Sequence, residues 1–228
     1  MKEAGTPVAE DLSVRDFYRR VWAEYADPRH HPITAAALAV QARVVQRWVR
    51  DRQPGRVLDL GCGPAPVLPP RTTSLVVCAD LVWEMLRPLR AAAGYPAVCL
   101  DARRLPFRRQ SFDLVWCGLL VDHIQGVRGW IEELLGVLSP GGTLGLACWD
   151  RSRLPRERYP EDSRMRYHPS SGGELRVASY PNWPESLEIL KAHDPQMTLE
   201  AFPIVPDSYV LQIVFTGKAA AAESGADP

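Results

Sequence analysis

A short apolar run that ends in an acidic residue and two glycines constrains the fold of this chain most. Residues 57–60 read VLDL, a near-continuous apolar run of the kind that forms a buried strand in a parallel sheet. Asp59 lies near the end of this run, and Gly61 and Gly63 then allow a tight turn. Such a turn lets a backbone approach an adenosine-containing cofactor closely. A glycine turn that joins a strand to a helix without any ligand has the same pattern.

A second acidic residue follows at an informative spacing. Residues 75–79 form another apolar run, which ends in Asp80. In a doubly wound sheet this strand lies beside the first, so an acid at its end, about 20 residues on, can bind the hydroxyls of a ribose. Nicotinamide-dependent enzymes also have an acidic residue at the end of this second strand. Their phosphate loop, however, has the pattern G-x-G-x-x-G, whereas Pro66 stands here at the last position and Asp59 precedes the first glycine. The sequence therefore disfavours a pyrophosphate-binding loop.

Five segments in order resemble a known family. The segments read VLDLGCGPA, VVCADLVWEML, CLDARRLPF, SFDLVWCGLLVDHI and LLGVLSPGGTLGL. From about Val57 to Trp149 the chain resembles the class I S-adenosylmethionine-dependent methyltransferases, in the branch that acts on small molecules and carrier-bound acyl groups. The resemblance implies an α/β fold of three αβα layers, Rossmann-like, with a seven-stranded and mostly parallel sheet. One antiparallel strand is expected near the C-terminus.

The resemblance also implies which residues contact S-adenosylmethionine. They follow the first four strands and are Asp59, Gly61, Cys62, Gly63, Asp80, Leu81, Asp101, Ala102 and Cys117. Asp59 and the glycine turn would line the methionine end, and Asp80 would bind the ribose hydroxyls. Asp101 and the amide of Ala102 would read the adenine edge, and the carbonyl of Cys117 would hold the methionine amino group. Strand-end caps and a core cysteine are the structural alternatives for these residues.

His123 and Asp122 are the candidate catalytic residues, because they follow the fourth strand at the expected mouth of the pocket. Methyl transfer depends mainly on holding a nucleophile in line with the methyl–sulfur bond. A general base matters for a hydroxyl nucleophile and matters less for a neutral amine. His123 is therefore interpreted either as this base or as a packing residue. No metal site is predicted, since the five cysteines lack CxxC spacing and lie in or beside apolar runs.

The N-terminal region predicts two helices, over residues 12–25 and 33–50. Tyr18, Trp22 and Tyr25 follow one another at spacings of four and three, which places them on one helix face. In the family that the chain resembles, such a helix commonly covers the cofactor as a lid. Tyr18 and Tyr25 are then candidate cofactor contacts and Trp22 is a packing anchor. An aromatic stripe that belongs to the core is the alternative.

The remaining pattern divides the chain into a helical cap or lid segment, residues 1–52, and a cofactor-binding domain, residues 53–218. Within that domain residues 150–183 are rich in Arg, Pro and Tyr, lack a sustained period, and are predicted to form an insertion. Residues 219–228 are predicted to be disordered. Further expected elements are helices over 82–92, 127–138 and 185–193, a strand over 143–149, and a hairpin from 198–204 and 209–216. Four prolines between residues 64 and 70 predict that the first crossover helix is missing or about one turn long.

Charge and composition bear on partners. The formal net charge is zero, so no overall field favours nucleic acid or an anionic membrane. The segment after the fourth strand reads Cys117-Gly118-Leu119-Leu120, unlike the D/N-P-P-Y type motif with which amino-group nucleic-acid methyltransferases clamp a flipped base. No run approaches the length of a membrane span, and residues 1–11 have no apolar segment typical of a signal peptide. We therefore expect a cytoplasmic monomer or homodimer that methylates a small molecule. A fold that binds S-adenosylmethionine but catalyses cyclisation or isomerisation, or serves as a scaffold, is the alternative.

Overall fold

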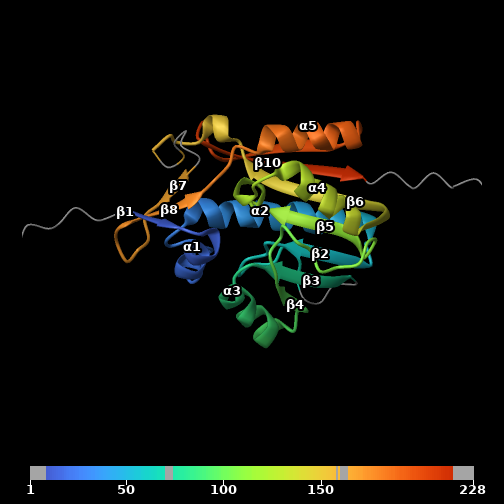
Figure 1. The fold of residues 1–228 in the computed structure, drawn as a ribbon, viewed down its shortest axis with the longest axis horizontal. Coiled ribbons are helices and arrows are strands. Elements are labelled where there is room, and N and C mark those ends of the chain that lie inside the picture. The colour runs from blue at the N-terminus through green and yellow to red at the C-terminus, as the bar shows by residue number, and fades with distance from the viewer. Residues whose placement is uncertain (1–8, 70–73, 158, 160–163, 218–228) are drawn as a thin grey trace, which may run out of the picture.

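The computed structural model describes residues 9–69, 74–157, 159 and 164–217. Its main sheet contains β2 (Arg56–Leu60), β3 (Leu75–Asp80), β4 (Ala97–Cys99), β5 (Phe112–Gly118), β6 (Leu138–Trp149), β9 (Thr198–Val205) and β10 (Tyr209–Gly217). The strand order is β4-β3-β2-β5-β6-β10-β9 (Figure 1). Every pair from β4 to β6 is parallel, and β10 is antiparallel to both neighbours. The predicted fold class is confirmed.

Helices cover both faces of this sheet. The helices are α2 (Pro32–Arg52), α3 (Trp83–Pro88) with a π-helical turn η1 (Leu89–Ala93), α4 (Val127–Val137) and α5 (Trp183–His193). Side chains of β2 alternate between the two faces: Val57 packs with α2 and α3, whereas Leu58 and Leu60 pack with α4 and α5. The continuous apolar run thus reflects a strand that is buried on both sides.

No helix forms in residues 61–69 and 74, the described part of the connection between β2 and β3. This confirms, for those residues, the prediction drawn from the prolines. Pro70 and residues 219–228 lie outside the described residues. In the described ranges no helix is both long enough and apolar enough to cross a membrane.

A small second sheet joins the N-terminal end of the described chain to residues 164–178. It has the order β1-β8-β7, with β1 (Ala9–Leu12), β8 (Glu174–Ala178) and β7 (Arg164–Tyr167), and it lies beside α1 (Val14–Val21) at one end of the molecule (Figure 1). Its core contains Phe17, Val21, Met165, Tyr167, Leu175 and Val177. We refer to β1, α1, β7 and β8 together as the cap.

The cap corrects three expectations. The first helix does not run over residues 12–25, because Leu12 belongs to β1 and α1 ends at Val21. Its fully buried side chains are Phe17 and Val21, while Trp22 is only half-buried and is not the anchor. The segment 150–183 is not irregular throughout, because it contains the antiparallel pair β7 and β8. Parallel pairing of β8 with β1 needs a partner that is far away in sequence, so no local pattern reveals it.

Candidate functional site

A cavity of about 380 Å³ lies at the carboxyl ends of β2, β3, β4 and β5, under the cap; we call it the outer cavity. Open α/β sheets bind ligands in this position. Most of the residues predicted from the sequence line it, namely Tyr18, Tyr25, Gly61, Gly63, Asp80, Leu81, Asp101, Ala102 and His123. Asp59, Cys62, Cys117 and Asp122 are not among its lining residues. The structure therefore gathers side chains and turns from the cap and from four strands around one space.

The carboxylate of Asp80 organises the glycine turn. Its Oδ2 accepts a hydrogen bond from the backbone N–H of Gly63 at 3.0 Å, and its Oδ1 accepts one from Val82 at 2.9 Å. Gly61 and Gly63 have φ values of 71° and 56°, in the left-handed region that favours glycine. Burial raises the pKa of Asp80, although these N–H groups oppose the shift. Each oxygen retains a further acceptor position for a ligand hydroxyl.

Asp59 does not line the cavity but holds the loop that follows the glycine turn. Its side chain is 1% exposed, and Oδ2 accepts a hydrogen bond from the N–H of Val67 at 2.9 Å. Burial, with a smaller contribution from the charge of Asp80, raises the pKa of Asp59 to about 7, although the hydrogen bond from Val67 opposes the shift. Asp59 therefore affects the cavity indirectly, by fixing the loop whose Val67 N–H it binds. Cys62 is also buried, and its thiol donates to the carbonyl of Gly63.

The end of β5 presents a glycine to the cavity. The side chain of Cys117 is buried in the core that faces α4, and Cys117 is not a lining residue of the cavity. The next residue, Gly118, lines the cavity. A Cβ atom at Gly118 would overlap Oε1 of Gln41, which lies buried in α2. This position therefore requires glycine for close packing of β5 against α2.

Asp101 is held by an arginine that the sequence analysis missed. The guanidinium of Arg103 donates to both carboxylate oxygens, at 3.0 Å from Nε and 2.6 Å from the terminal nitrogen. These bonds hold the pKa of Asp101 below its ordinary value. Trp130 donates to the carbonyl of Ala102 at 3.1 Å and fixes the same loop. The D-x-R spacing of Asp101 and Arg103 could have indicated this ion pair, since a turn brings residues two apart to the same side.

His123 meets the cap at the edge of the outer cavity. It lies in η2 (Val121–His123), a short 3-10 helix after β5. Its Nε2 is 2.8 Å from the hydroxyl of Tyr18, and its Nδ1 is 2.9 Å from the carbonyl oxygen of Ala178. Burial lowers the pKa of His123. A carbonyl oxygen only accepts hydrogen bonds, so Nδ1 of His123 carries the hydrogen. Nε2 of the neutral ring then accepts a hydrogen bond from the Tyr18 hydroxyl.

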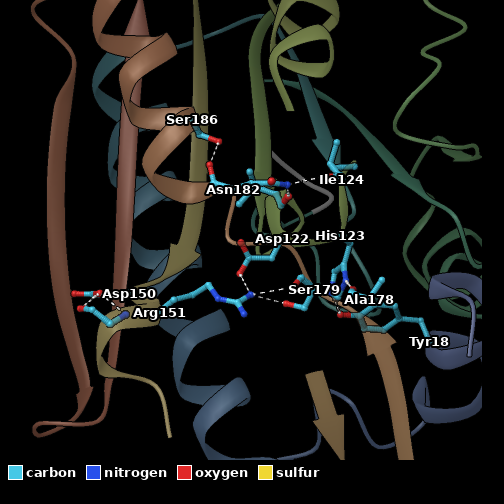
Figure 2. A network of polar contacts seen from close by, with 12 residues as sticks. Tyr18, Asp122, His123, Ile124, Asp150, Arg151, Ala178, Ser179, Asn182 and Ser186 are labelled. Carbon is cyan, nitrogen blue, oxygen red and sulfur yellow. Dashed lines mark hydrogen bonds and ion pairs between the residues drawn. The ribbon is translucent and has the colours of Figure 1, made fainter. Parts of the chain in front are cut away.

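A second cavity of about 40 Å³ lies behind this pair; we call it the inner cavity. Asp122 lines it, together with aromatic side chains and residues of the insertion. Arg151 lies 3.8 Å from Oδ2 of Asp122 and donates to Oγ of Ser179 at 2.8 Å. Burial raises the pKa of Asp122 to about 6, against the charge of Arg151. Figure 2 shows the two sets of contacts, Arg151 with Asp122 and Ser179, and Tyr18 with His123 and Ala178.

Known proteins share this architecture. Residues 58–146 match the family model described as a methyltransferase domain. The chain is 29% identical over 159 residues to the uncharacterized protein Rv1405c of Mycobacterium tuberculosis, a match that covers 63% of this chain and 54% of that protein. It is 33% identical over 113 residues to the malonyl-(acyl-carrier protein) O-methyltransferase of Enterobacter lignolyticus, covering 47% and 44%. The chain thus spans about half the length of the curated relatives that it matches.

The fold likeness extends over nearly the whole chain. The crystal structure of the 1,6-didemethyltoxoflavin-N1-methyltransferase of Burkholderia thailandensis superposes with a TM-score of 0.56 at 19% identity, covering 96% of this chain and 98% of that one. The domain match and this fold both point to methyltransferases. Residues 58–146 match a methyltransferase domain, and the chain as a whole has the fold of a methyltransferase solved with S-adenosylhomocysteine.

Proposed function

We propose that this chain binds S-adenosylmethionine in the outer cavity and transfers its methyl group to a small-molecule acceptor. The observation that carries the proposal is the gathering of the predicted contact residues around one cavity at the carboxyl ends of four parallel strands. The volume of about 380 Å³ lies within the range of cofactor sites. A buried carboxylate, Asp80, and a turn without Cβ atoms at Gly61 and Gly63 fit a ligand that combines hydroxyls with a close-lying backbone.

The proposed roles follow the position of each residue. Asp80 would bind the ribose hydroxyls, and Asp101 with the amide of Ala102 would bind the adenine edge. The glycine turn and the carbonyl of Cys117 would hold the methionine part, with Asp59 and Cys62 supporting the turn from below. When bound, S-adenosylmethionine supplies an electrophilic methyl carbon. The protein then has to orient the acceptor and exclude water, a role that we assign to Tyr18 of α1 and to Tyr25, which both line the cavity.

Two similar proteins support a small or carrier-bound acceptor. One is named as a malonyl-(acyl-carrier protein) O-methyltransferase, and the other as a methyltransferase of the small molecule 1,6-didemethyltoxoflavin. The zero net charge of this chain agrees, because nucleic-acid binding depends on cationic surface. A cytoplasmic location, a monomeric or homodimeric state and the absence of nucleic-acid partners stay predictions from the sequence.

The division of the chain is proposed as follows. A cap segment, residues 1–52, precedes the methyltransferase domain, residues 53–218, and residues 150–183 form an insertion in that domain. Parallel pairing of β1 with β8 supports a shared role for the cap segment and the insertion, because their strands belong to one small sheet. Both would then close over the same ligand.

Calorimetric titration with S-adenosylhomocysteine tests cofactor binding. We expect the wild type to bind it and Asp80→Asn to bind about 10 to 100-fold more weakly, because a hydrogen bond to a charged group contributes about 1.5–3 kcal/mol. Asp51→Ala, which removes an exposed acid of α2 outside the cavity, is the control and should bind like the wild type. The melting temperature of each unliganded variant is measured as well, since Asp80 also holds the turn. Absence of binding by the wild type at millimolar ligand contradicts the proposal.

The alternative is a protein that binds S-adenosylmethionine but catalyses another step, such as cyclisation, or acts as a scaffold. The two functions differ in their products. Mass spectrometry of a reaction with S-adenosylmethionine and candidate acceptors detects S-adenosylhomocysteine together with a methylated acceptor only if methyl transfer occurs. Conversion of the acceptor without S-adenosylhomocysteine supports the alternative.

A further inference from the structure

We propose that His123 is a positioning residue that holds α1 over the outer cavity, and that it does not take a proton from the acceptor. Its ring binds the hydroxyl of Tyr18 on one side and the carbonyl of Ala178 on the other. We call these two hydrogen bonds the clasp. The proposal rests on the proposed function and adds to it a residue that controls how long the cofactor stays bound.

Both ring nitrogens of His123 are bound by the cap. Nδ1 donates to the carbonyl of Ala178, the last residue of β8, at 2.9 Å. Nε2 accepts from the Tyr18 hydroxyl at 2.8 Å. A general base needs a lone pair within hydrogen-bond reach of the acceptor proton. His123 gives this lone pair to Tyr18, so it could act on an acceptor only after the bond to α1 has broken.

The hydroxyl of Tyr18 has a second partner, because it is also hydrogen-bonded to Tyr25. Tyr18 donates its own proton to Nε2 of His123, so Tyr25 is the donor in this second bond. The Tyr18 ring lies edge to face with the rings of Tyr25 and His123, with centroids 5.3 and 5.4 Å away. Hydrogen bonds and ring packing together fix the place of Tyr18 in the wall of the outer cavity.

The residues that follow β8 bind η2 through its backbone as well. The N–H of Tyr180 donates to the carbonyl of Asp122 at 2.6 Å. The side-chain amide of Asn182 donates to the carbonyl of Val121 at 2.9 Å (Figure 2). The β8 side of the cap is therefore held on η2 by several hydrogen bonds, and the bond from His123 to the end of β8 is one of them.

On the side of α1, Tyr18 makes the hydrogen bond that reaches η2 at the end of β5. The buried side chains of α1, Phe17 and Val21, pack in the core of the cap rather than against the main sheet. Two ion pairs of this region also lie within the cap, namely Arg20 with Glu10 and Arg164 with Asp11. Loss of the Tyr18–His123 bond should therefore let α1 move away from the cavity.

The clasp closes one wall of the outer cavity. The start of α1 lines this cavity through Ser13, Val14, Arg15 and Tyr18. Opening of a lid often limits the release of a bound ligand. Without the clasp, a bound cofactor should therefore leave faster. A general base acts on the acceptor during the chemical step and has no effect on cofactor release, so the dissociation rate distinguishes a clasp from a base.

Stopped-flow measurement of S-adenosylhomocysteine dissociation tests the clasp. His123→Ala and Tyr18→Phe should each release the ligand about tenfold faster than the wild type, because each loses a hydrogen bond of the closed wall. His123→Gln should bring release back to within about threefold of the wild type, because an amide oxygen can accept from Tyr18 but is not a base. His193→Ala, at the end of α5 outside the cavity, is the control and should release like the wild type.

The melting temperature of each variant separates the clasp from packing. A lower melting temperature with an unchanged dissociation rate in His123→Ala and Tyr18→Phe overturns the proposal, since it leaves His123 a packing residue. Unchanged release and unchanged stability in both variants overturn it as well. Release by His123→Gln that is as fast as by His123→Ala contradicts a role through hydrogen bonding.

Hydrogen exchange of the unliganded protein gives a readout that does not depend on the cofactor. Tyr18→Phe and His123→Ala should lower the protection of α1 about tenfold, with protection of β2 and β5 unchanged. Retained protection of α1 in both variants overturns the clasp. Failure of the wild type to bind S-adenosylhomocysteine overturns the proposed function instead, and the expected loss of protection would then still support the clasp.

Discussion

The hydroxyl of Tyr167, in β7, donates a hydrogen bond to Oε1 of Glu24 at 2.9 Å, although 143 residues separate the two in the chain. The other oxygen of Glu24 accepts from the hydroxyl of Ser170. Burial opposes ionisation of Glu24, but these two hydroxyls hold its pKa below the ordinary value. His31 also contacts Tyr167. The part-buried carboxylate of Glu24, just after α1, is therefore tied to the β7–β8 region by two hydroxyls.

Tyr167→Phe should destabilise the protein by about 1–3 kcal/mol, because it leaves one oxygen of the part-buried Glu24 without this donor. Urea unfolding measures the loss. Tyr209→Phe is the matched control, since the Tyr209 hydroxyl makes no hydrogen bond within the described residues while its ring packs on Trp149. Because the same hydroxyl also contacts Nε2 of His31, equal unfolding free energies for the two variants would mean that the two contacts of the Tyr167 hydroxyl together contribute no stability.

Deletion of residues 1–26 should abolish turnover and leave the seven-stranded sheet folded. The deletion removes β1 and α1, which belong to a core separate from those on the two faces of the main sheet. Hydrogen exchange should then show loss of protection in β7 and β8 and retained protection in β2, β3 and β5. An unfolded deletion protein would show instead that the N-terminal helix belongs to the main core.

The stability of the protein should depend on the ionisation of Asp59. Its pKa is about 7 in the folded state and near 3.8 as an ordinary aspartate. Between these values the folded state binds a proton that the unfolded chain does not, so the contribution of Asp59 to stability rises as the pH falls from about 7 to about 4. Above pH 7 the carboxylate is charged in both states, and its burial lowers stability.

Asp59→Asn tests this prediction, because the amide oxygen can still accept the hydrogen bond from Val67. Relative to the wild type, the variant should be more stable at pH 8, and its advantage should shrink as the pH falls through 6 to 5. Urea unfolding at the three pH values gives the differences. A difference that does not change with pH would show that Asp59 does not titrate in this range.

Gly61→Ala should weaken S-adenosylhomocysteine binding and lower stability by about 1–2 kcal/mol, the cost of a left-handed conformation for a residue with Cβ. The added Cβ would also lie 3.2 Å from Cδ2 of Leu120. Gly129→Ala is the control, because no atom lies within 4 Å of its Cβ position in α4. Alanine there should raise the stability by about 0.5–1 kcal/mol. Similar effects of the two substitutions on the melting temperature would contradict the role of the turn.

Much of the main sheet could be predicted from local patterns. The runs that became β2 and β3 are mostly apolar, and a strand buried on both faces has that signature in any context. Asp80 and the two glycines could be placed at the carboxyl ends of these strands because strand ends and turns depend on neighbouring residues. The absence of a helix from residues 61–69 followed likewise from the prolines, whose rings cannot continue a helix.

The partners of the site residues depended on contacts between distant segments. Met165 and Tyr167 alternate with arginines along β7, but four residues are too short to distinguish a strand from a loop. The apolar face of β7 is buried in a cluster to which α1, far away in sequence, contributes Phe17 and Val21. The bond from Tyr18 to His123 joins residues 105 positions apart. Asp59 shows the same limit, since its position in a DxGxG pattern does not reveal that it binds Val67 below the cavity. The sequence by itself determined the sheet, the glycine turn and Asp80, because their interactions are local or periodic. Only the tertiary structure decided the cap, the two cavities and the partner of His123, because these arise where segments far apart in sequence bury their surfaces together.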